Sequence, residues 1–334
     1  MKLCYVMTKN TSIHDQRFLD KAKENNIRLY TIRVGLKTAG IDYFRLKKLL
    51  KQKKPDILQG GWLLSSGFVS ALSDYHPFIL YPFASDILLR PHDNFIYKKI
   101  VQFTLKRADH IICDADHLKK EIQKLVNVDN ISVIPRGVDI TQFNNEVKVS
   151  GNKKWIILTR NFEQIYGIEY FLNAVPKILE EVPEARVILC GKGSLENKFK
   201  QIVKNKKLEQ YVYFVGYIPH EKIQWYLNVA DVYVSPSLSD GTSVSLLEAM
   251  ACKLPCIVTD IPAIKEWIKD GVNGYIVPKR NSEALADKII ELLQDSKKRK
   301  LFGERNRKIV EKRADWNKNF EEEIKIWRQV CQTL

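Results

Sequence analysis

The chain has 334 residues, 45% of them hydrophobic, which is enough for two folded domains of about 150 residues each and excludes an extensively disordered protein. Its 54 Lys and Arg against 39 Asp and Glu leave a net charge of +15, which favours anionic partners such as nucleotides, phosphates, nucleic acid or an acidic membrane surface. No window holds the roughly 18 apolar residues of a membrane-spanning helix, so we expect peripheral membrane contact at most.

The first residues, MKLCYVMTKN, lack the long apolar core and small-residue cleavage site of a secretion signal. Cys4, Cys113 and Cys190 fall inside predicted strands, where a free thiol behaves as a small buried hydrophobe. Three residues separate Cys252 from Cys256, and no histidine is close in sequence, which disfavours a zinc or redox site. We therefore expect reduced thiols and a cytoplasmic chain that reaches, at most, the inner face of a membrane.

Short β-branched and aromatic runs alternate with longer amphipathic stretches, the pattern of parallel sheets covered by helices. A helix is predicted over 15–26, where Phe18, Leu19 and Ala22 share a face. The polar stretch 144–154, NNEVKVSGNKK, predicts a linker. The strands predicted before it are LCYVM, IRLYTIRV, DILQ, FILYP, HIIC and ISVIP.

The second half repeats the scheme with the strands WIILT, RVILCG, VYFVG, DVYVSPS, PCIVTD and GYIVP, each but the last followed by a helical stretch. We therefore predict an α/β chain of two doubly wound, Rossmann-like parallel-sheet domains, 1–145 and 152–315, and a C-terminal helix over 316–334 that packs back on the first domain. Ligands of open α/β sheets bind beyond the carboxyl ends of the strands. Two facing sheets would thus have a cleft between them lined by those loops.

The segment SPSLSDGTSVSLLEAMA, residues 235–251, follows a predicted strand and leads into a helix. The unpaired amides of a helix start, together with the helix dipole, form an anion site. Gly241 would let the backbone approach a ligand closely. Ser245 and Glu248 also have the S-x-x-E spacing of a capping box, so a capped helix preceded by a plain turn is the alternative.

Arg160 follows the first strand of the second half, where an arginine can hold a diphosphate through two parallel hydrogen bonds. The sequence GKG at 191–193 follows the next strand and provides another loop that permits close approach. Three phosphate-compatible loops at strand ends in one domain indicate an anion site more strongly than any one of them alone.

Together these segments resemble the family 4 glycosyltransferases of the GT-B fold. The resemblance covers most of residues 131–278, in the expected order, and extends more loosely to ASDILLRP and LKRADHIICDADHLKKE in the first half. It implies a retaining enzyme that moves a sugar from a nucleotide diphosphate donor to an acceptor, with no metal or cofactor, in polysaccharide or glycolipid synthesis. The matching pieces are VIPRGVDITQF, LTRNFEQIYGIEYFLNAV, GKG, VYFVGYIP, ADVYVSPS, SDGTSVSLLEAMACKLPCIVTD and DGVNGYIVP.

The resemblance also implies roles for residues of the second domain. Asp240 would hold hydroxyls of the transferred sugar, Glu248 would accept hydrogen bonds from the ribose, and Arg160 would hold the diphosphate. Backbone groups would read the base. The residues expected to bind the donor are Arg160, Tyr166, Gly191, Lys192, Gly193, Gly216, Tyr217, Ile218, Pro219, Asp240, Gly241, Thr242, Ser243, Val244 and Glu248.

Two positions depart from the family pattern. The family usually has Glu where this chain has Asp240, and Lys where it has Tyr166. The inferred phosphate clamp therefore lacks one positive charge. Lys192 or Arg136 would substitute for it, or Tyr166 itself would hydrogen-bond a phosphate or simply pack.

In the first domain the predicted catalytic residues, beside Asp240 and Arg160, are His14 and Asp86. His14 follows the first strand and would position an acceptor hydroxyl, and a solvated histidine is the alternative. Asp86 lies in a loop where relatives carry an acidic residue, and a helix cap is the alternative. Trp62 lies at the same predicted rim.

The basic runs RLKKLLKQKK (45–54) and DSKKRK (295–300) are either solvated helix faces or, for the amphipathic FRLKKLL, a contact with anionic lipid. Competing interpretations are a nucleotide-sugar epimerase of the same fold, a non-catalytic nucleotide-sugar-binding relative, and a nucleic-acid-binding protein. We expect no nucleic-acid partner, because no zinc finger, basic stacking ribbon or helix-turn-helix is recognisable. The expected partners are a nucleotide-sugar donor, a glycan or lipid-linked acceptor, and an anionic membrane.

Overall fold

The computed structural model describes residues 1–9, 13–145 and 154–333. It divides into two compact units: Met1–Pro135 with Lys318–Leu334, and Arg136–Asn317. Most of the predicted linker, 146–153, lies outside the described residues. Residues 136–145 thus group with the second unit.

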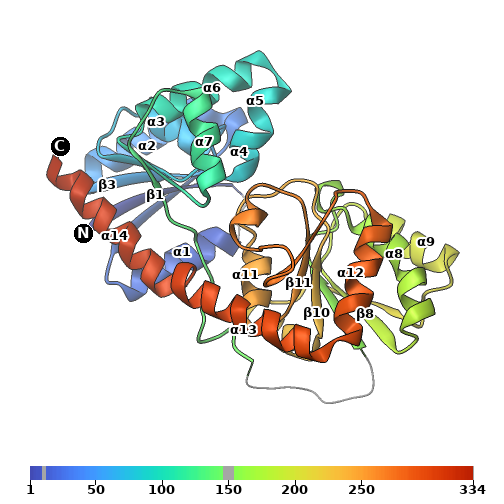
Figure 1. The fold of residues 1–334 in the computed structure, drawn as a ribbon. Coiled ribbons are helices and arrows are strands. Elements are labelled where there is room, and N and C mark those ends of the chain that lie inside the picture. Colours follow the sequence, from blue (N-terminus) through green and yellow to red (C-terminus); the bar gives the residue numbers. More distant parts are fainter. Residues whose placement is uncertain (10–12, 146–153, 334) are drawn as a thin grey trace. The chain divides into compact units, whose positions relative to one another are not determined.

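The first unit is built on a parallel sheet with strand order β2-β1-β3-β4-β5-β6 (Figure 1). In the central strand β1, residues 3–7 are all buried, because helices cover both faces of the sheet, and this explains the continuous apolar run LCYVM. All six strands predicted for this half are confirmed. Their bounds are β1 Lys2–Thr8, β2 Arg28–Val34, β3 Ile57–Gly60, β4 Phe78–Leu80, β5 His110–Cys113 and β6 Ile131–Val133.

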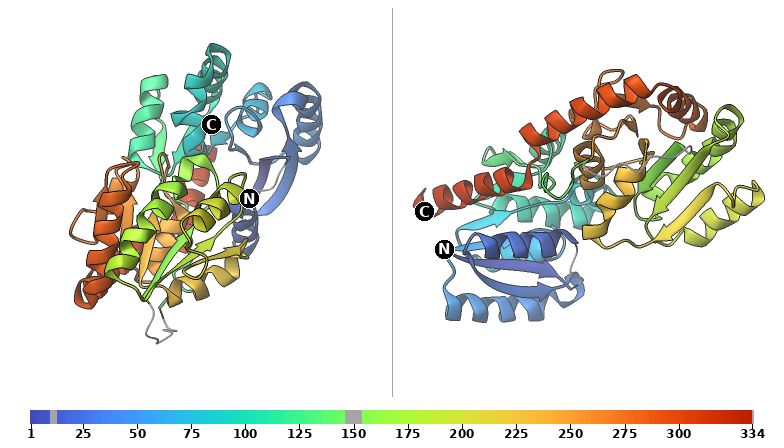
Figure 2. Two further views of the ribbon diagram at one scale, coloured as in Figure 1. Left: turned by 90° about the vertical axis from the view of Figure 1, so that its right-hand side faces the viewer. Right: turned by 90° about the horizontal axis from the view of Figure 1, so that it is seen from below.

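Helices cover both faces of this sheet, as right-handed crossovers require (Figure 2). The helix α3 packs against both α2 and α6 on one face. On the other face Phe18 of α1 packs edge-on against Phe320 and Trp327 of α14. The bounds are α1 Ile13–Glu24, η1 Leu36–Thr38, α2 Ala39–Lys53, α3 Ser66–Leu72, α4 Ala84–Leu88, α5 Arg90–Asp93, α6 Phe95–Arg107, α7 Asp116–Leu125 and α14 Trp316–Thr333.

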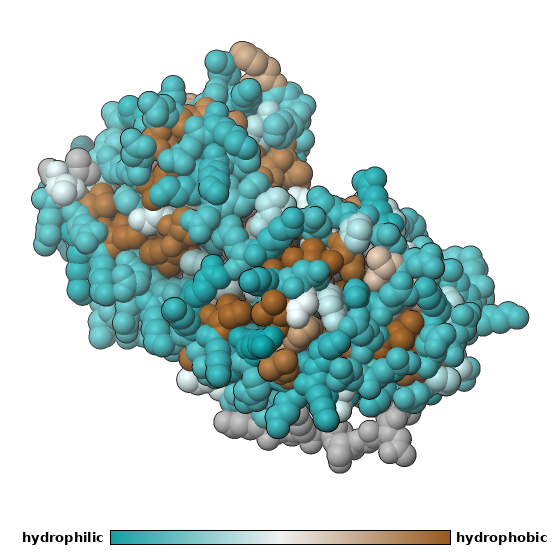
Figure 3. Space-filling model, in the orientation of Figure 1, coloured by the Kyte–Doolittle hydropathy of each residue, from teal (hydrophilic) through white to brown (hydrophobic). Residues whose placement is uncertain are grey.

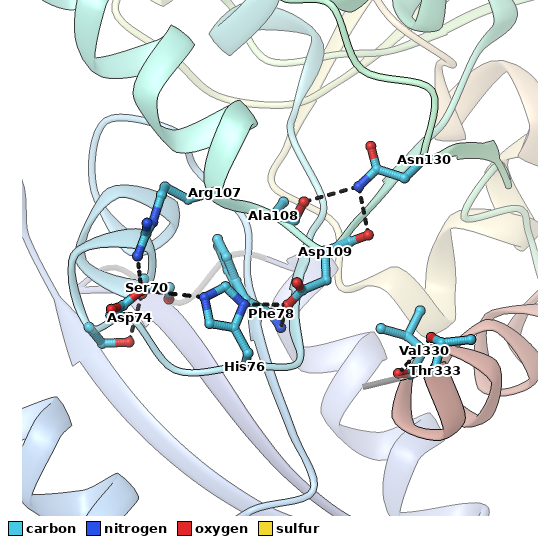
Figure 4. A network of polar contacts seen from close by, with 11 residues as sticks. Ser70, Asp74, His76, Phe78, Arg107, Ala108, Asp109, Asn130, Val330 and Thr333 are labelled. Carbon is cyan, nitrogen blue, oxygen red and sulfur yellow. Dashed lines mark hydrogen bonds and ion pairs between the residues drawn. The ribbon is translucent and has the colours of Figure 1, made fainter.

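A polar network fixes the turns at the amino edge of this sheet (Figure 4). Asp109 accepts a hydrogen bond from the backbone N–H of Phe78 and contacts His76 Nδ1, both at 2.6 Å. Asn130 donates to the carbonyls of Ala108 and Asp109 at 3.0 and 2.6 Å. His76 therefore has a structural role in holding β4 and β5 in place.

The second unit is built on a parallel sheet with strand order β12-β11-β10-β7-β8-β9. The six strands predicted for this half are confirmed. The sheet separates two apolar cores, one around Phe171 and Leu189 and the other around Tyr233 and Met250. The bounds are β7 Lys154–Thr159, β8 Ala185–Cys190, β9 Val212–Gly216, β10 Val232–Ser235, β11 Cys256–Thr259 and β12 Gly274–Val277.

The prediction of a helix between the last two strands is wrong. The expectation that no helix follows the last strand is also wrong. A short 3-10 turn, η3, joins β11 to β12, because Asn273 bonds the backbone N–H of Lys269 and the carbonyl of Trp267 at 2.7 and 2.9 Å in place of helical partners. The bounds of the helices are η2 Gln164–Tyr166, α8 Ile168–Glu181, α9 Glu196–Asn205, α10 His220–Val229, α11 Val244–Ala251, η3 Ile264–Glu266, α12 Ser282–Gln294 and α13 Ser296–Arg313.

All six cysteines are described and all carry free thiols. Cys4, Cys113 and Cys190 lie in β1, β5 and β8 as predicted, and burial raises the pKa of each thiol to about 12. Across the described residues, no helix combines the length and the apolar character needed to cross a bilayer.

Candidate active site

The strand order of the second unit places its switch point between β7 and β10. From β7 the chain moves to β8 and β9 on one side and then returns to β10 on the other side. Ligands of open α/β sheets bind at this switch point, outside the carboxyl ends of the strands. Arg160 directly follows β7 and Asp240 follows β10, so the two predicted residues lie together at the switch point.

Arg160 is held at this point by several acceptors. Its guanidinium forms an ion pair with Asp240 and donates to Ser237 Oγ and Ser245 Oγ, both at 3.2 Å. Only 9% of the Arg160 side chain is exposed. The sequence interpretation missed this ion pair, although the ends of β7 and β10 are the natural place to look for a charged pair. The guanidinium is therefore fixed in orientation before any ligand arrives.

Tyr166 completes the setting of Arg160. The Arg160 Cζ atom lies 4.4 Å from the centroid of the Tyr166 ring. Such a cation–π contact is worth about 0.5–2 kcal/mol, more where water is excluded. Of the alternatives considered for Tyr166, the structure shows packing, and the packing partner is the arginine. Tyr166 thus restrains the guanidinium, and a hydrogen bond from its hydroxyl to a phosphate stays a prediction.

The glycines of the neighbouring loops are explained by close packing of backbone on backbone. A Cβ atom on Gly191 would lie 2.1 Å from the carbonyl oxygen of Arg160, and one on Gly193 would lie 2.5 Å from that of Phe162. Gly167, with φ +60°, is pressed against the carbonyl oxygen of Pro236 in the same way. These contacts brace the segment that carries Arg160. The predicted donor contacts of Gly191 and Gly193 stay a prediction.

The start of α11 has the form expected of an anion site. Ser243 is the N-cap residue, and its side chain accepts from the backbone N–H of Leu246 at 3.3 Å. The capping-box alternative for Ser245 and Glu248 is therefore wrong, because Ser245 lies inside the helix and its Oγ bonds Arg160 and the Tyr233 hydroxyl instead. The first amides of such a helix start are the groups that would bind an anion, and this role stays a prediction.

The loop between Asp240 and α11 is itself braced. The Thr242 Oγ1 accepts a hydrogen bond from Trp267 Nε1 at 3.3 Å, and the backbone N–H of Gly241 donates to Asp240 Oδ1 at 3.0 Å. Gly241, Thr242 and Ser243 are buried, and Val244 is half-buried. The residues expected to hold the diphosphate and sugar thus have little freedom to rearrange.

Glu248 lies on the second turn of α11 and is 5% exposed. Its Oε1 lies 2.8 Å from Nε2 of His220, the first residue of α10. His220 packs against Phe143 with a ring separation of 5.2 Å. Sequence reasoning assigned no role to His220, although it directly follows the GYIP segment of the family pattern. His220 therefore fixes the carboxylate that is predicted to meet the ribose.

Replacing His220 with alanine is expected to weaken nucleoside diphosphate binding about threefold to tenfold, because the Glu248 carboxylate loses a partner. His220→Gln, which can still donate to Glu248, should retain most of the affinity. Titration calorimetry measures both, with His117→Ala as the matched control on the first unit. Equal affinity of the alanine variant and the unchanged protein would show that His220 has no positioning role.

The segment predicted to read the base continues from β9 at the same edge of the sheet. Gly216 has φ +80°, and its carbonyl accepts from the backbone N–H of Gly191 at 2.8 Å. Tyr217 is 68% exposed, and Ile218 and Pro219 are half-buried. Lys192 is exposed close to Gly216, whereas Arg136 is buried at 6% exposure. Lys192 is therefore the better placed of the two substitutes proposed for the missing cation.

In the first unit the switch point lies between β1 and β3. His14 is the second residue of α1, directly beyond β1, and its side chain lies outside the described part of the structure. Trp62 follows β3 and stacks on Phe83 at 4.4 Å. Asp86 is 3% exposed and accepts from the backbone N–H of Phe83 at 3.2 Å, as a capping residue of α4. Its predicted catalytic role stays a prediction.

Burial raises the pKa of Asp86 to about 7, above the value of about 3.9 in an unfolded chain. Between about pH 3.9 and about pH 7 the Asp86 carboxyl has lost its proton in the unfolded chain but retains it in the folded protein. The free energy of unfolding therefore falls as the pH rises through this range. Unfolding by urea at pH 5 and pH 8 should show a fall in the free energy of unfolding of about 2.7 kcal/mol relative to Asp86→Asn, because about two pH units of this window lie between pH 5 and the folded pKa. Asp116→Asn, an exposed first-turn carboxylate, is the control. A loss of the same size in Asp86→Asn would contradict the assignment.

Three or more His, Cys, Asp or Glu side chains do not gather as a metal-ligand set anywhere in the described ranges. Arg160 follows β7 and Lys192 follows β8, so both cationic side chains lie beyond the carboxyl ends of neighbouring strands.

Two doubly wound parallel sheets in series, each with a switch point at the carboxyl ends of its strands, define the class of two-domain α/β proteins with the GT-B architecture. Residues 139–309, slightly more than half of the chain, match the family model of glycosyl transferases group 1, and residues 4–115 match that of glycosyl transferase 4-like proteins. The chain belongs to this family, the family 4 glycosyltransferases of the GT-B fold.

Curated relatives are similar over most of the chain. The N-acetyl-alpha-D-glucosaminyl L-malate synthase of Bacillus anthracis is 29% identical over 63% of this chain and 57% of its own length. An uncharacterized glycosyltransferase of Methanocaldococcus jannaschii is 25% identical over 93% of this chain and 82% of its own length. The phosphatidylinositol N-acetylglucosaminyltransferase gpi3 subunit of Schizosaccharomyces pombe is 22% identical over 71% and 52%. The matches cover only 57–62% of the length of the first three relatives.

Solved structures share the fold at low sequence identity. The sucrose-phosphate synthase of Thermosynechococcus elongatus superposes with a TM-score of 0.89 at 16% identity over 100% of both chains. Anabaena HepE in complex with UDP superposes with a TM-score of 0.84 at 15% identity over 98% of this chain and 100% of that one. These likenesses agree with the predicted GT-B fold.

Proposed function

We propose that this chain is a retaining glycosyltransferase that takes a sugar from a UDP-, GDP- or ADP-sugar. The observation that carries the proposal is the fixed guanidinium of Arg160 beside Asp240 and the start of α11, at the switch point of the second sheet. A nucleoside diphosphate that leaves the sugar develops negative charge, and fixed donors stabilise it without rearrangement. The UDP bound in the HepE structure supports a nucleotide donor.

In the proposed reaction the bond between the anomeric carbon and the diphosphate oxygen breaks, and a bond to the acceptor oxygen forms on the same face. The acceptor hydroxyl gives its proton to the leaving diphosphate, so atoms and charge balance. The transition state resembles an oxocarbenium ion. Asp240 would hold sugar hydroxyls and Glu248 the ribose, while Arg160 and Lys192 would supply the positive charge that a metal provides elsewhere. On this basis we propose activity without a metal or cofactor.

The acceptor is proposed to be a glycan or a lipid-linked molecule, in polysaccharide or glycolipid synthesis at the cytoplasmic face of a membrane. The relatives support this choice, since one is the gpi3 subunit of a phosphatidylinositol N-acetylglucosaminyltransferase and another is a phosphatidyl-myo-inositol mannosyltransferase of Mycobacterium leprae. His14 and Asp86 are the proposed acceptor-side residues.

A panel of UDP-, GDP- and ADP-sugars tests the proposal. The true donor should raise the unfolding temperature, because it binds only the folded state, and should be hydrolysed slowly without acceptor. Release of nucleoside diphosphate and free sugar of retained configuration, in the presence of a metal chelator, supports the metal-independent transferase. Tight binding without turnover favours a binding protein, and conversion of one nucleotide sugar into another favours an epimerase.

A further inference from the structure

One helical layer of the first unit exposes large apolar side chains. It consists of α2, α3 and α6, in which α3 packs against both others. Ile41 and Phe44 of α2 are 68% and 71% exposed, and Phe95 and Ile96 of α6 are 71% and 67% exposed. The space-filling view shows the opposite side of this unit, which bears α7 and α14 and where polar residues cover most of the surface between apolar ones (Figure 3).

Phe95 and Ile96 border an open apolar groove between α3 and α6. The rings of Phe68 and Phe103 meet edge-on across it at 6.0 Å. Its charged lining residue is Lys99, whose Nζ lies 5.2 Å from the centroid of the Phe95 ring. The groove is therefore apolar at its base with an ammonium group at its rim. Its lining residues are Phe68, Leu72, Phe95, Ile96, Lys99, Ile100 and Phe103.

The surroundings of the groove are strongly basic. The helix α6 carries Lys98, Lys99, Lys106 and Arg107 and no acidic residue. Lysines also line the exposed side of α2, whose acidic residue, Asp42, is buried and paired with Arg45. Exposed apolar side chains flanked by lysines are typical of helices that lie in the interface of an anionic membrane.

We infer that the face formed by α2, α3 and α6 docks on an anionic lipid bilayer. Phe95, Ile96, Ile41 and Phe44 enter the headgroup region, and the lysines contact the anionic headgroups. A second copy of this chain does not fit the face, because it would bring a net charge of +15 against the same lysines. A bilayer offers negative charge and apolar depth together.

The docking face reaches the edge of the sheet where a ligand would bind. α2 follows β2, and α6 ends immediately before β5, so Ile41, Phe44, Phe95 and Ile96 all lie toward the carboxyl ends of the strands. An acceptor anchored in the bilayer would thus present its polar head near the switch point of the first unit. This last step rests on the proposed transfer activity, whereas the docking itself does not.

Flotation with vesicles of phosphatidylcholine, alone or with about one third phosphatidylglycerol, tests the docking at low and raised salt. We expect binding to the anionic vesicles that weakens as salt rises. Phe95→Glu with Ile96→Glu should lower it at least tenfold, and Lys98→Ala and Lys99→Ala about fivefold each. Leu301→Glu, on an exposed position of α13, is the matched control and should bind normally.

Circular dichroism and donor hydrolysis report whether each variant is folded, and they also separate failure of docking from failure of the proposed transfer. No binding to anionic vesicles at low salt would overturn the inference. So would binding that the Phe95→Glu, Ile96→Glu variant retains. If that variant instead turned a dimer into a monomer without vesicles, the face would be an interface between copies.

Discussion

Replacing Arg160 with alanine is expected to lower the kcat/KM of donor hydrolysis about a hundredfold to a thousandfold, the usual cost of removing one fixed donor to a developing anion. The side chain is only 9% exposed and its guanidinium is held by Asp240, Ser237 and Ser245, so the substitution removes a positive charge that is fixed in position. Steady-state kinetics with the donor found by the nucleotide-sugar panel measures the effect.

Arg186→Ala is the matched control for this experiment. The Arg186 Cζ atom also lies over an aromatic ring, 4.8 Å from the centroid of Tyr211. Arg186 is, however, at the amino end of β8, whereas Arg160 lies beyond the carboxyl end of β7. It should keep its activity, and circular dichroism should show both variants folded. Full activity of Arg160→Ala would remove the phosphate role assigned to this residue.

Glu248→Gln is expected to weaken nucleoside diphosphate binding about tenfold to a hundredfold, because a hydrogen bond to a charged acceptor contributes about 1.5–3 kcal/mol. The substitution keeps the shape of the side chain and removes the charge that faces His220. Titration calorimetry with the nucleoside diphosphate measures the loss.

A nucleotide that lacks the ribose hydroxyls shows whether the loss arises at the ribose. The unchanged protein should discriminate strongly against the 2′,3′-dideoxy form, and Glu248→Gln should discriminate much less. Glu169→Gln, a carboxylate paired with Lys198 on α9, is the control. If Glu248→Gln kept the full preference for the ribose form, Glu248 would not contact the ribose.

The strands could be predicted because each is a short β-branched or aromatic run bounded by polar residues, as WIILT before Arg160 and VYFVG before Tyr217 illustrate. The stretch between β11 and β12 could not be predicted. Its apolar spacing suits a helix, yet the Asn273 side chain takes over backbone partners that a helix would use. The spacing of apolar residues does not record local side-chain competition of this kind.

At the site, sequence reasoning placed Arg160 and Asp240 at neighbouring strand ends because loop order alone brings them there. It did not find His220, since that contact joins residues 28 positions apart on two different helices. It assigned Gly191 to ligand approach, which stays a prediction, and it did not find that the carbonyl of Arg160 occupies the space that a side chain would fill. A glycine in a loop has the same appearance in sequence whether ligand or backbone lies against it.

The ion pair between Arg160 and Asp240 has a consequence for selectivity. A simple anion such as inorganic phosphate would compete with the Asp240 carboxylate for the guanidinium. A ligand that brings hydroxyl groups together with its negative charge could engage both partners at once. We therefore expect the internal pair to favour sugar-bearing phosphates over inorganic phosphate.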